Sequence, residues 1–245
     1  MPSSHGCTVG KVGSASVSAG ARHRRDAHRS ASPIPSVKEL QVCPIPQQVA
    51  KQVIVAHHYI HSFPGGTAIA FGVFDAERLM GVATLGVGPT NGFRLVDGAT
   101  RNDCLTLSRM WLEDELPKNS ESRVLGMIIR SLTRHTTVKF LLAYSDPSQG
   151  HLGVIYQATN WLYTGLSDAM PLYDLGDGVA RHSRSLGQTY GTHSVQHFKE
   201  NGVSVRLVPQ SRKHRYLLFL DPSWRARLQV PVLPYPKREA ADGRG

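Results

Sequence analysis

Apolar positions along the chain repeat in two ways, every second residue and every third or fourth residue, and these repeats predict both strands and helices. Two β-like runs, at 67–74 and 79–87, are separated by a short turn, as in a hairpin. Other apolar runs predict further strands, and helical spacing predicts three helices. The predicted strands lie at 38–45, 105–112, 138–144, 203–208 and 216–220, and the predicted helices at 46–60, 123–132 and 150–163.

The order of these elements favours a mixed α/β sheet. A doubly wound sheet alternates strands with helices, whereas the early strands here are joined by a hairpin and the last two strands are predicted to pair antiparallel. This order resembles the GNAT type of acyltransferase fold. We therefore expect a GNAT-like single domain.

The two ends of the chain differ in composition from the middle. Residues 1–36 are rich in Ser, Gly, Ala, His and Arg and are expected to form a disordered basic tail. We expect the catalytic domain at 37–230 and an extended tail at 231–245, where prolines and polar residues predominate. No apolar stretch reaches the roughly 18 residues that a membrane helix needs, so a spanning protein is excluded.

The charge balance indicates a polyanionic partner. The sequence has 28 Lys and Arg against 18 Asp and Glu, a net charge of +10, which attracts nucleic acid first and acidic membrane surfaces second. A turn before the last predicted strand offers Arg212, Lys213 and Arg215 as phosphate contacts. The 3 cysteines are widely spaced and lack the pattern of a zinc site.

The segment 143–165 is the densest in polar and aromatic side chains. The predicted strand delivers Asp146 to its carboxyl end, where α/β proteins place ligands. In the predicted helix, Tyr156 and Tyr163 lie seven residues apart and share a face. A purely structural alternative is that Asp146 caps the helix and both tyrosines belong to the core.

Three blocks of the sequence resemble the Mom family of phage DNA adenine modification proteins. The first comprises Ser145-Asp-Pro, Gly150-His, Gly153, Ile155-Tyr-Gln-Ala and Asn160-Trp-Leu-Tyr-Thr-Gly. The second comprises Leu107-Ser-Arg and Pro117-Lys-Asn-Ser-Glu-Ser-Arg, and the third His57-His-Tyr with Pro64-Gly-Gly-Thr. Together they cover most of residues 50–220.

This resemblance implies a GNAT-related enzyme that converts the N6 amino group of adenine in double-stranded DNA to N6-carbamoylmethyl, protecting phage DNA from restriction in the host cytoplasm. Arg109, Ser122, Asp146 and Tyr156 fall on the family's functional positions. Because N6 is paired within a duplex, the adenine must be flipped, and stacking on aromatic rings offsets the cost. The aromatic residues available for this are Tyr59, Trp161 and Tyr163.

Two kinds of cofactor are compatible with the resemblance. An acyl-CoA-like donor would meet Asn119, Ser120 and Arg123, in the loop where acyltransferases of this fold bind pyrophosphate, although that loop lacks their glycines. An iron ion would use His58 and Asp146. Asp146 is the candidate base and Tyr156 the candidate proton donor. Two alternatives stay open, an ordinary N-acetyltransferase acting on a small amine or protein and a non-catalytic DNA-binding accessory protein.

Overall fold

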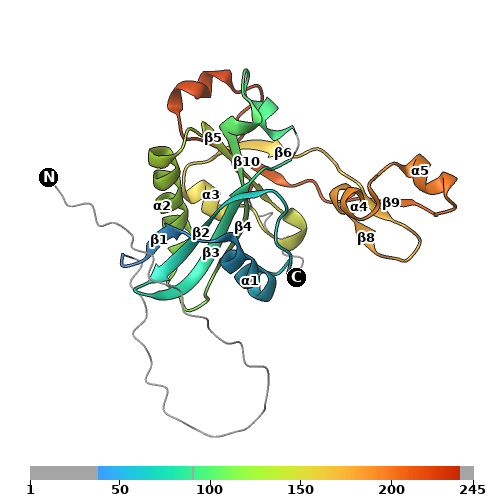
Figure 1. Ribbon diagram of the computed structural model, residues 1–245. Helices are drawn as coiled ribbons and strands as arrows, with labels where there is room; N and C mark the ends of the chain where they lie inside the picture. Colours follow the sequence, from blue (N-terminus) through green and yellow to red (C-terminus); the bar gives the residue numbers. More distant parts are fainter. Residues whose placement is uncertain (1–37, 90, 238–245) are drawn as a thin grey trace, which may run out of the picture.

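A seven-stranded mixed sheet forms the centre of the molecule (Figure 1). A computed structural model describes residues 38–89 and 91–237, so the predicted tail at 1–36 lies outside the described residues. The strand order is β1-β2-β3-β4-β5-β10-β6, and every neighbouring pair is antiparallel except β4 and β5. The strands of this sheet are β1 (Gln41–Pro44), β2 (Thr67–Asp75), β3 (Arg78–Gly86), β4 (Cys104–Leu112), β5 (Phe140–Ser145), β6 (Leu162–Leu166) and β10 (His214–Phe219). The predicted mixed α/β fold is confirmed.

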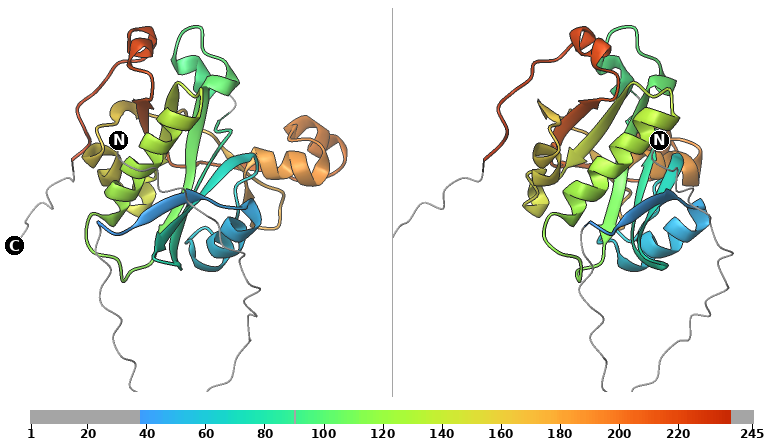
Figure 2. Two further views of the ribbon diagram at one scale, coloured as in Figure 1. Left: turned by 60° about the vertical axis from the view of Figure 1, so that its left-hand side comes forward. Right: turned by 90° about the vertical axis from the view of Figure 1, so that its left-hand side faces the viewer.

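Helices cover both faces of this sheet (Figure 2). Helix α2 (Ser120–His135) buries Val124, Leu125 and Ile128 against one face, where they meet alternate residues of the central strands. Helix α1 (Gln47–His57) buries Ala50 and Ile54 against the opposite face. The short helices η1 (Gly92–Leu95), η2 (Arg101–Asp103) and η4 (Pro222–Arg227) complete the layers, with η1 and η4 contributing to a cluster around β4, β5 and β10.

The parallel pair β4–β5 holds together over only half of β4. Cys104–Leu107 pairs with Phe140–Ala143, after which β4 continues to Leu112 and β5 to Ser145 without pairing to each other. The β3–β4 ladder also shifts register directly after this point of β4, between the pairs Leu85–Leu107 and Thr84–Arg109. Backbone and side chains of both strands are therefore available to contact a ligand at the point where the pairing stops.

The helix predicted at 150–163 is wrong in length. A short helix η3 (Pro147–Gln149) comes first, and α3 spans only Val154–Ala158. Gly153 at its start (φ 69°) and Asn160 after it (φ 62°) adopt left-handed conformations that an α-helix does not continue through. Tyr163 therefore lies on strand β6 and does not share a helix face with Tyr156.

The predicted pairing of the strands at 203–208 and 216–220 is also wrong. Strand β9 (Arg206–Val208) belongs to a separate three-stranded sheet with β7 (Leu172–Asp174) and β8 (Ala180–Arg181), whereas β10 lies between β5 and β6. With α4 (Ser183–Tyr190) and α5 (Val195–Glu200), this small sheet forms a lobe that projects from the main body (Figure 1).

Two segments connect this lobe to the sheet, one at Ser167 and one at Arg212 and Lys213, and we call them the neck of the lobe. Hydrogen bonds hold the two segments together. The Ser167 amide donates to the Lys213 carbonyl at 2.8 Å, and the Lys213 amide donates to Ser167 Oγ at 3.0 Å. Arg212 Nε donates to the Ser167 carbonyl at 2.7 Å. The lobe thus leaves the sheet after β6 and returns directly into β10.

Candidate active site

Polar and aromatic side chains converge where β4 and β5 stop pairing. His58 and Tyr59 follow α1, Arg109 comes from β4, Asp146 follows β5, and Tyr156 comes from α3. The rings of His58 and Tyr59 stack with centroids 4.4 Å apart. Burial raises the pKa of the Tyr59 phenol, with the positive charge of Arg109 opposing and the negative charge of Asp146 reinforcing the effect. These five residues, which we call the cleft-edge cluster, bring together four separate segments of the chain.

Arg109 is the central cation of the cleft-edge cluster. Its Nη1 donates to the Ser108 carbonyl at 2.7 Å, while its buried Nε has no hydrogen-bond partner. Burial lowers the pKa of this guanidinium, although it stays charged at neutral pH. A partly buried guanidinium with an unused N–H is suited to hold a polar or anionic group.

Asp146 is held by three side chains. Its carboxylate forms an ion pair with Lys213, and it accepts hydrogen bonds from Ser148 Oγ at 2.7 Å and Ser211 Oγ at 2.8 Å. Burial by itself raises the pKa of this carboxyl, but the bonds from Lys213, Ser148 and Ser211 outweigh it and hold the pKa well below its usual range. Asp146 also accepts from the Ser148 amide and so caps η3, whereas α3 begins after Gly153.

Tyr156 is buried and aromatic contacts fix its ring. The ring centroid lies 5.2 Å from that of Trp161 and 5.1 Å from that of Tyr216, and the residue is 9% exposed. Burial raises the pKa of its hydroxyl far above the usual value, with smaller contributions from Tyr59 and Tyr216. The phenol therefore stays protonated at neutral pH and has a proton to offer, although the raised pKa also makes it a weaker acid.

His58 and Asp146 do not fit an iron site. His58 Nδ1 accepts the Ile60 amide at 3.1 Å, so the neutral ring carries its proton on Nε2 and offers no free lone pair. Asp146 Oδ1 accepts hydrogen bonds from Ser148 and Ser211 and Oδ2 pairs with Lys213, so the carboxylate charge is already balanced by a cation, although Oδ2 keeps a free lone pair. Among the described residues, no group of three or more His, Cys, Asp or Glu side chains is arranged to hold a metal.

His58 lies just beyond the end of α1 and is buried. The helix ends at His57, so its register does not extend to His58, which turns inward and is 6% exposed, whereas the His57 ring stacks on Trp111. Burial, together with the charges of Arg109 and His61, lowers the pKa of His58 to about 4.

This low pKa makes His58 a source of acid sensitivity. Because the folded-state pKa lies below the ordinary value of about 6.5, the neutral ring favours folding above pH 6.5, and this contribution is lost as the pH falls toward 4. Between pH 7 and pH 5 we expect the Tm to fall by about 5 °C more in the wild type than in His58→Gln. Thermal unfolding of both proteins at the two pH values checks this, and equal shifts in both would contradict it.

The predicted pyrophosphate loop lies at the start of α2. Asn119 precedes the helix in a left-handed conformation (φ 70°), and the Ser120 and Ser122 hydroxyls donate to the carbonyls of Pro117 and Asn119. Arg123 is exposed and donates to the Lys38 carbonyl at 3.3 Å. The first turn also carries Glu121, whose negative charge opposes a phosphate at this helix end.

The predicted DNA contacts fall into two groups. Tyr59 is 55% exposed beside the cleft-edge cluster and is available for stacking, and Arg212 is exposed at the lobe neck. Tyr163 is 8% exposed and its hydroxyl bonds to His214 Nδ1 at 3.0 Å, so it is a core residue and cannot stack on a base. The remaining two cations are engaged within the protein, Lys213 with Asp146 and Arg215 with Thr164.

Two residues of the site were missed by reasoning from the sequence. The His151 ring meets Tyr59 edge-on with centroids 6.0 Å apart, and Ser211 bonds to Asp146 across 65 residues. The Gly150-His pair was already part of the first motif block and was the available signal for His151. Ser211 had no such signal because it stands among basic residues after a lobe that the sequence pattern did not predict.

Comparison with known proteins places this site in a family. The model of the Mom protein family matches residues 39–237, which include the whole cleft-edge cluster. The chain is 31% identical over 212 residues to the methylcarbamoylase mom of Escherichia phage Mu, covering 82% of this chain and 85% of that protein. The chain belongs to the Mom protein family.

Solved acetyltransferases are among the structures similar to this Mom-family chain. RimL, a ribosomal L7/L12 alpha-N-protein acetyltransferase, gives a TM-score of 0.43 at 10% identity, covering 77% of this chain and 98% of that chain. Arabidopsis thaliana NAA60 in complex with acetyl-CoA gives a TM-score of 0.44 at 8% identity, with coverages of 74% and 98%. Within the described residues of the Mom-family chain, no helix has the length and apolarity needed to cross a membrane.

Proposed function

We propose that this Mom-family protein is a transferase that attaches a carbamoylmethyl group to N6 of adenine in double-stranded DNA. The observation that carries the proposal is the cleft-edge cluster, in which a protonated phenol, an ionised carboxylate and a partly buried guanidinium meet where β4 and β5 stop pairing. The identity to a named methylcarbamoylase over most of both chains supports the same transfer. The protein would thus act on phage DNA in the host cytoplasm and shield it from restriction.

The proposed chemistry is a displacement at the methylene carbon of an activated carbamoylmethyl donor. The N6 lone pair forms the new N–C bond, and the bond from that carbon to the leaving group breaks with its electron pair going to the leaving group. Tyr156 donates a proton to the leaving group, and N6, which is cationic after the attack, loses a proton to the Asp146 carboxylate. A carboxylate of low pKa suffices for this step because alkylated N6 is strongly acidic. Atoms and charge then balance.

A flipped adenine is required for this chemistry because N6 is paired inside a duplex. Tyr59 presents a ring that is 55% exposed and braced from behind by His58, whose ring stacks on it. Base stacking on an aromatic ring contributes about 1–3 kcal/mol, which offsets the cost of unpairing. We propose Tyr59 as the platform on which the flipped adenine rests.

An ordinary N-acetyltransferase that uses acetyl-CoA is supported less well. Such enzymes bind a pyrophosphate at the helix that follows β4, yet this helix start carries Glu121 in its first turn and its two serine hydroxyls bond to backbone carbonyls. Arg123 is the nearest cation in the same turn and is exposed. We therefore assign Asn119, Ser120, Ser122 and Arg123 no more than an anion-binding role toward an unidentified donor.

Mass spectrometry of nucleosides tests the proposed function directly. Plasmid DNA from cells that express the protein should contain a deoxyadenosine species heavier by a carbamoylmethyl group, and this species should be absent from cells with an empty vector. An acetylated deoxyadenosine would identify an acetyltransferase instead. Unmodified DNA in the presence of folded protein, in both a laboratory host and the natural host, would contradict the proposal.

Arg212 offers a separate test of the DNA partner. It is exposed and follows Ser211, which bonds to Asp146, so a duplex at the cleft-edge cluster would pass close to it. Arg212→Ala should weaken duplex affinity for all sequences alike and reduce the slope of log Kd against log salt by about one. Arg78→Ala, at the β2–β3 turn, removes another exposed arginine, which is paired with Glu115, and should leave the slope unchanged. Equal slopes in all three proteins would exclude Arg212 as a phosphate contact.

A further inference from the structure

Buried polar atoms without a partner gather on one face of β3 and β4. Among the described residues, four buried side-chain nitrogen or oxygen atoms have no hydrogen-bond partner, and three of them are Thr84 Oγ1, Thr106 Oγ1 and Arg109 Nε. Thr84 is the register partner of Arg109, and Thr106 pairs with Gly86 two residues along the same strand. Because leaving a buried polar group unpaired is costly, three such atoms at neighbouring positions indicate a site that awaits a polar ligand.

These three side chains lie on the side of the sheet that α1 covers. Thr84 stands between Ala83 and Leu85, both of which face α2 in the core, so its own side chain points to the opposite side. Thr84 is fully buried and Thr106 is 5% exposed. The positive charge of Arg109 also acts on His58, which places this face beside the cleft-edge cluster.

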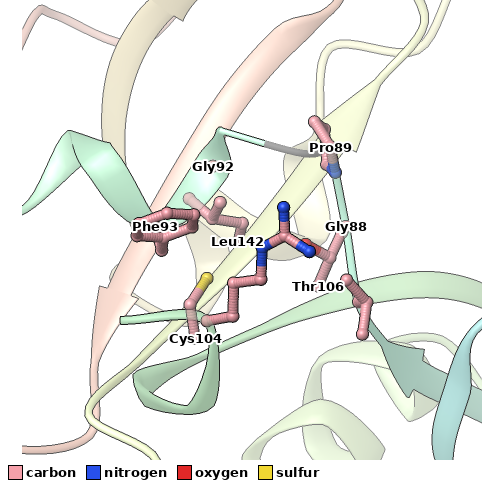
Figure 3. Close-up of a pocket in the computed structure, with 9 residues that line it drawn as sticks. Gly88, Pro89, Gly92, Phe93, Cys104, Thr106 and Leu142 are labelled. Carbon is pink, nitrogen blue, oxygen red and sulfur yellow. The ribbon is translucent and has the colours of Figure 1, made fainter. Parts of the chain in front are cut away.

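A small hollow reaches Thr106, the one member of these three residues that lines it. Thr106 and Cys104 line it together with Gly88 and Gly92 (Figure 3). Gly88 lies so close to the threonine that a Cβ at position 88 would be 1.9 Å from Thr106 Oγ1. The hydroxyl is thus packed against the backbone of Gly88, where no side chain would fit.

The donors and acceptors of these atoms match a primary amide. Arg109 Nε–H donates only, which suits the amide oxygen, whereas the two threonine hydroxyls accept and suit the amide N–H groups. A nucleobase is too large for side chains that are this deeply buried, and an acetyl group has no N–H to offer. We propose that Thr84, Thr106 and Arg109 form an amide pocket that holds the carbamoyl end of the group to be transferred.

This assignment rests on the proposed function, and it explains how the enzyme would select its donor. Held by its amide, the donor would present its methylene carbon toward the cleft-edge cluster. A donor that carries acetyl in place of carbamoylmethyl would leave the three buried polar atoms unpaired, and sites built this way reject such analogues strongly. The pocket thus provides discrimination that the pyrophosphate loop does not.

Threonine to valine substitutions test the pocket through two opposite readouts. Thr84→Val and Thr106→Val keep the side-chain shape and remove an unpaired hydroxyl, so each should raise the Tm of the protein by a few degrees. Each should also lower the carbamoylmethyl-deoxyadenosine content of plasmid DNA about tenfold, because one amide N–H loses its acceptor. Thr164→Val is the matched control, since that buried hydroxyl donates to the Arg215 carbonyl and accepts from Arg215 Nε. It should lower the Tm and leave the modification near the wild-type level.

The outcomes separate the pocket from the proposed function. If the wild type modifies DNA and both valine variants modify it equally well, the pocket is overturned and the function stands. A lower Tm in both valine variants would also overturn the pocket, because the hydroxyls would then have partners in the folded protein. If the wild type itself leaves DNA unmodified, the proposed function fails, and the pocket assignment falls with it.

Discussion

Tyr156→Phe is expected to lower the carbamoylmethyl-deoxyadenosine content of plasmid DNA by about 10²–10⁴-fold while the protein stays folded. The phenol is kept protonated by burial, which raises its pKa far above the usual value. Its ring contacts with Trp161 and Tyr216 are made by carbon atoms that phenylalanine retains. The substitution therefore removes a proton donor and keeps the packing. Nucleoside mass spectrometry measures the fall in modification, and thermal unfolding checks that the protein stays folded.

Tyr163→Phe is the matched control for this prediction. Tyr163 is as buried as Tyr156, but its hydroxyl bonds to His214 Nδ1 and its ring packs on Tyr216 within the sheet. Its loss should cost stability, about 1 kcal/mol for one hydrogen bond, and leave modification near the wild-type level. Full activity in Tyr156→Phe, or equal losses in both variants, would contradict a proton-donating role for Tyr156.

The hydrophobic pattern predicted the central sheet well and its insertions poorly. Strands β2 to β5 and helix α2 carry clear periodicity because each buries a face in the core, so their positions followed from the sequence. Helix α3 ends where Asn160 takes a left-handed conformation, and an asparagine gives no clear warning of this in a sequence. The lobe consists of strands of two or three residues and short helices, which are too short to show a period.

The candidate site was predictable where motif and topology agreed. Arg109, Asp146 and Tyr156 come from different segments, and the resemblance had already grouped them before the structure brought them together. The fit of His58 and Asp146 to a metal could not be judged from the sequence, because their hydrogen-bond partners depend on contacts that no local pattern reveals. The amide pocket was missed for the same reason, since a threonine within an apolar strand carries no signal of an unpaired hydroxyl.

Asp146→Asn is expected to reduce both stability and modification. An asparagine turns an N–H₂ or a neutral oxygen toward Lys213, so a partly buried ammonium loses its counter-charge. We expect a loss of about 1–3 kcal/mol in the free energy of unfolding at pH 7 and about a 10²-fold fall in modification. Chemical denaturation and nucleoside mass spectrometry measure the two effects. The stability loss should also depend on pH, because it should become smaller at acidic pH.

The pH dependence follows from the depressed pKa of Asp146. Its contribution to stability is fully present above the unfolded-state pKa of about 3.9 and is lost as the pH falls through the folded-state value. The difference between wild type and Asp146→Asn should therefore be constant from pH 5 to pH 8 and shrink below pH 4.

Lys213→Met separates the anchoring role of Asp146 from its chemical role. This variant breaks the same ion pair but leaves the carboxylate with its bonds from Ser148 and Ser211. If Asp146 accepts the proton from N6, Lys213→Met should keep most of the modification despite a comparable loss of stability. If both variants lose modification in proportion to stability, Asp146 acts through the neck of the lobe, because Ser211 and Lys213 are the residues by which the lobe returns to the sheet. The carboxylate would then be a positioning residue, and N6 would give its proton to solvent.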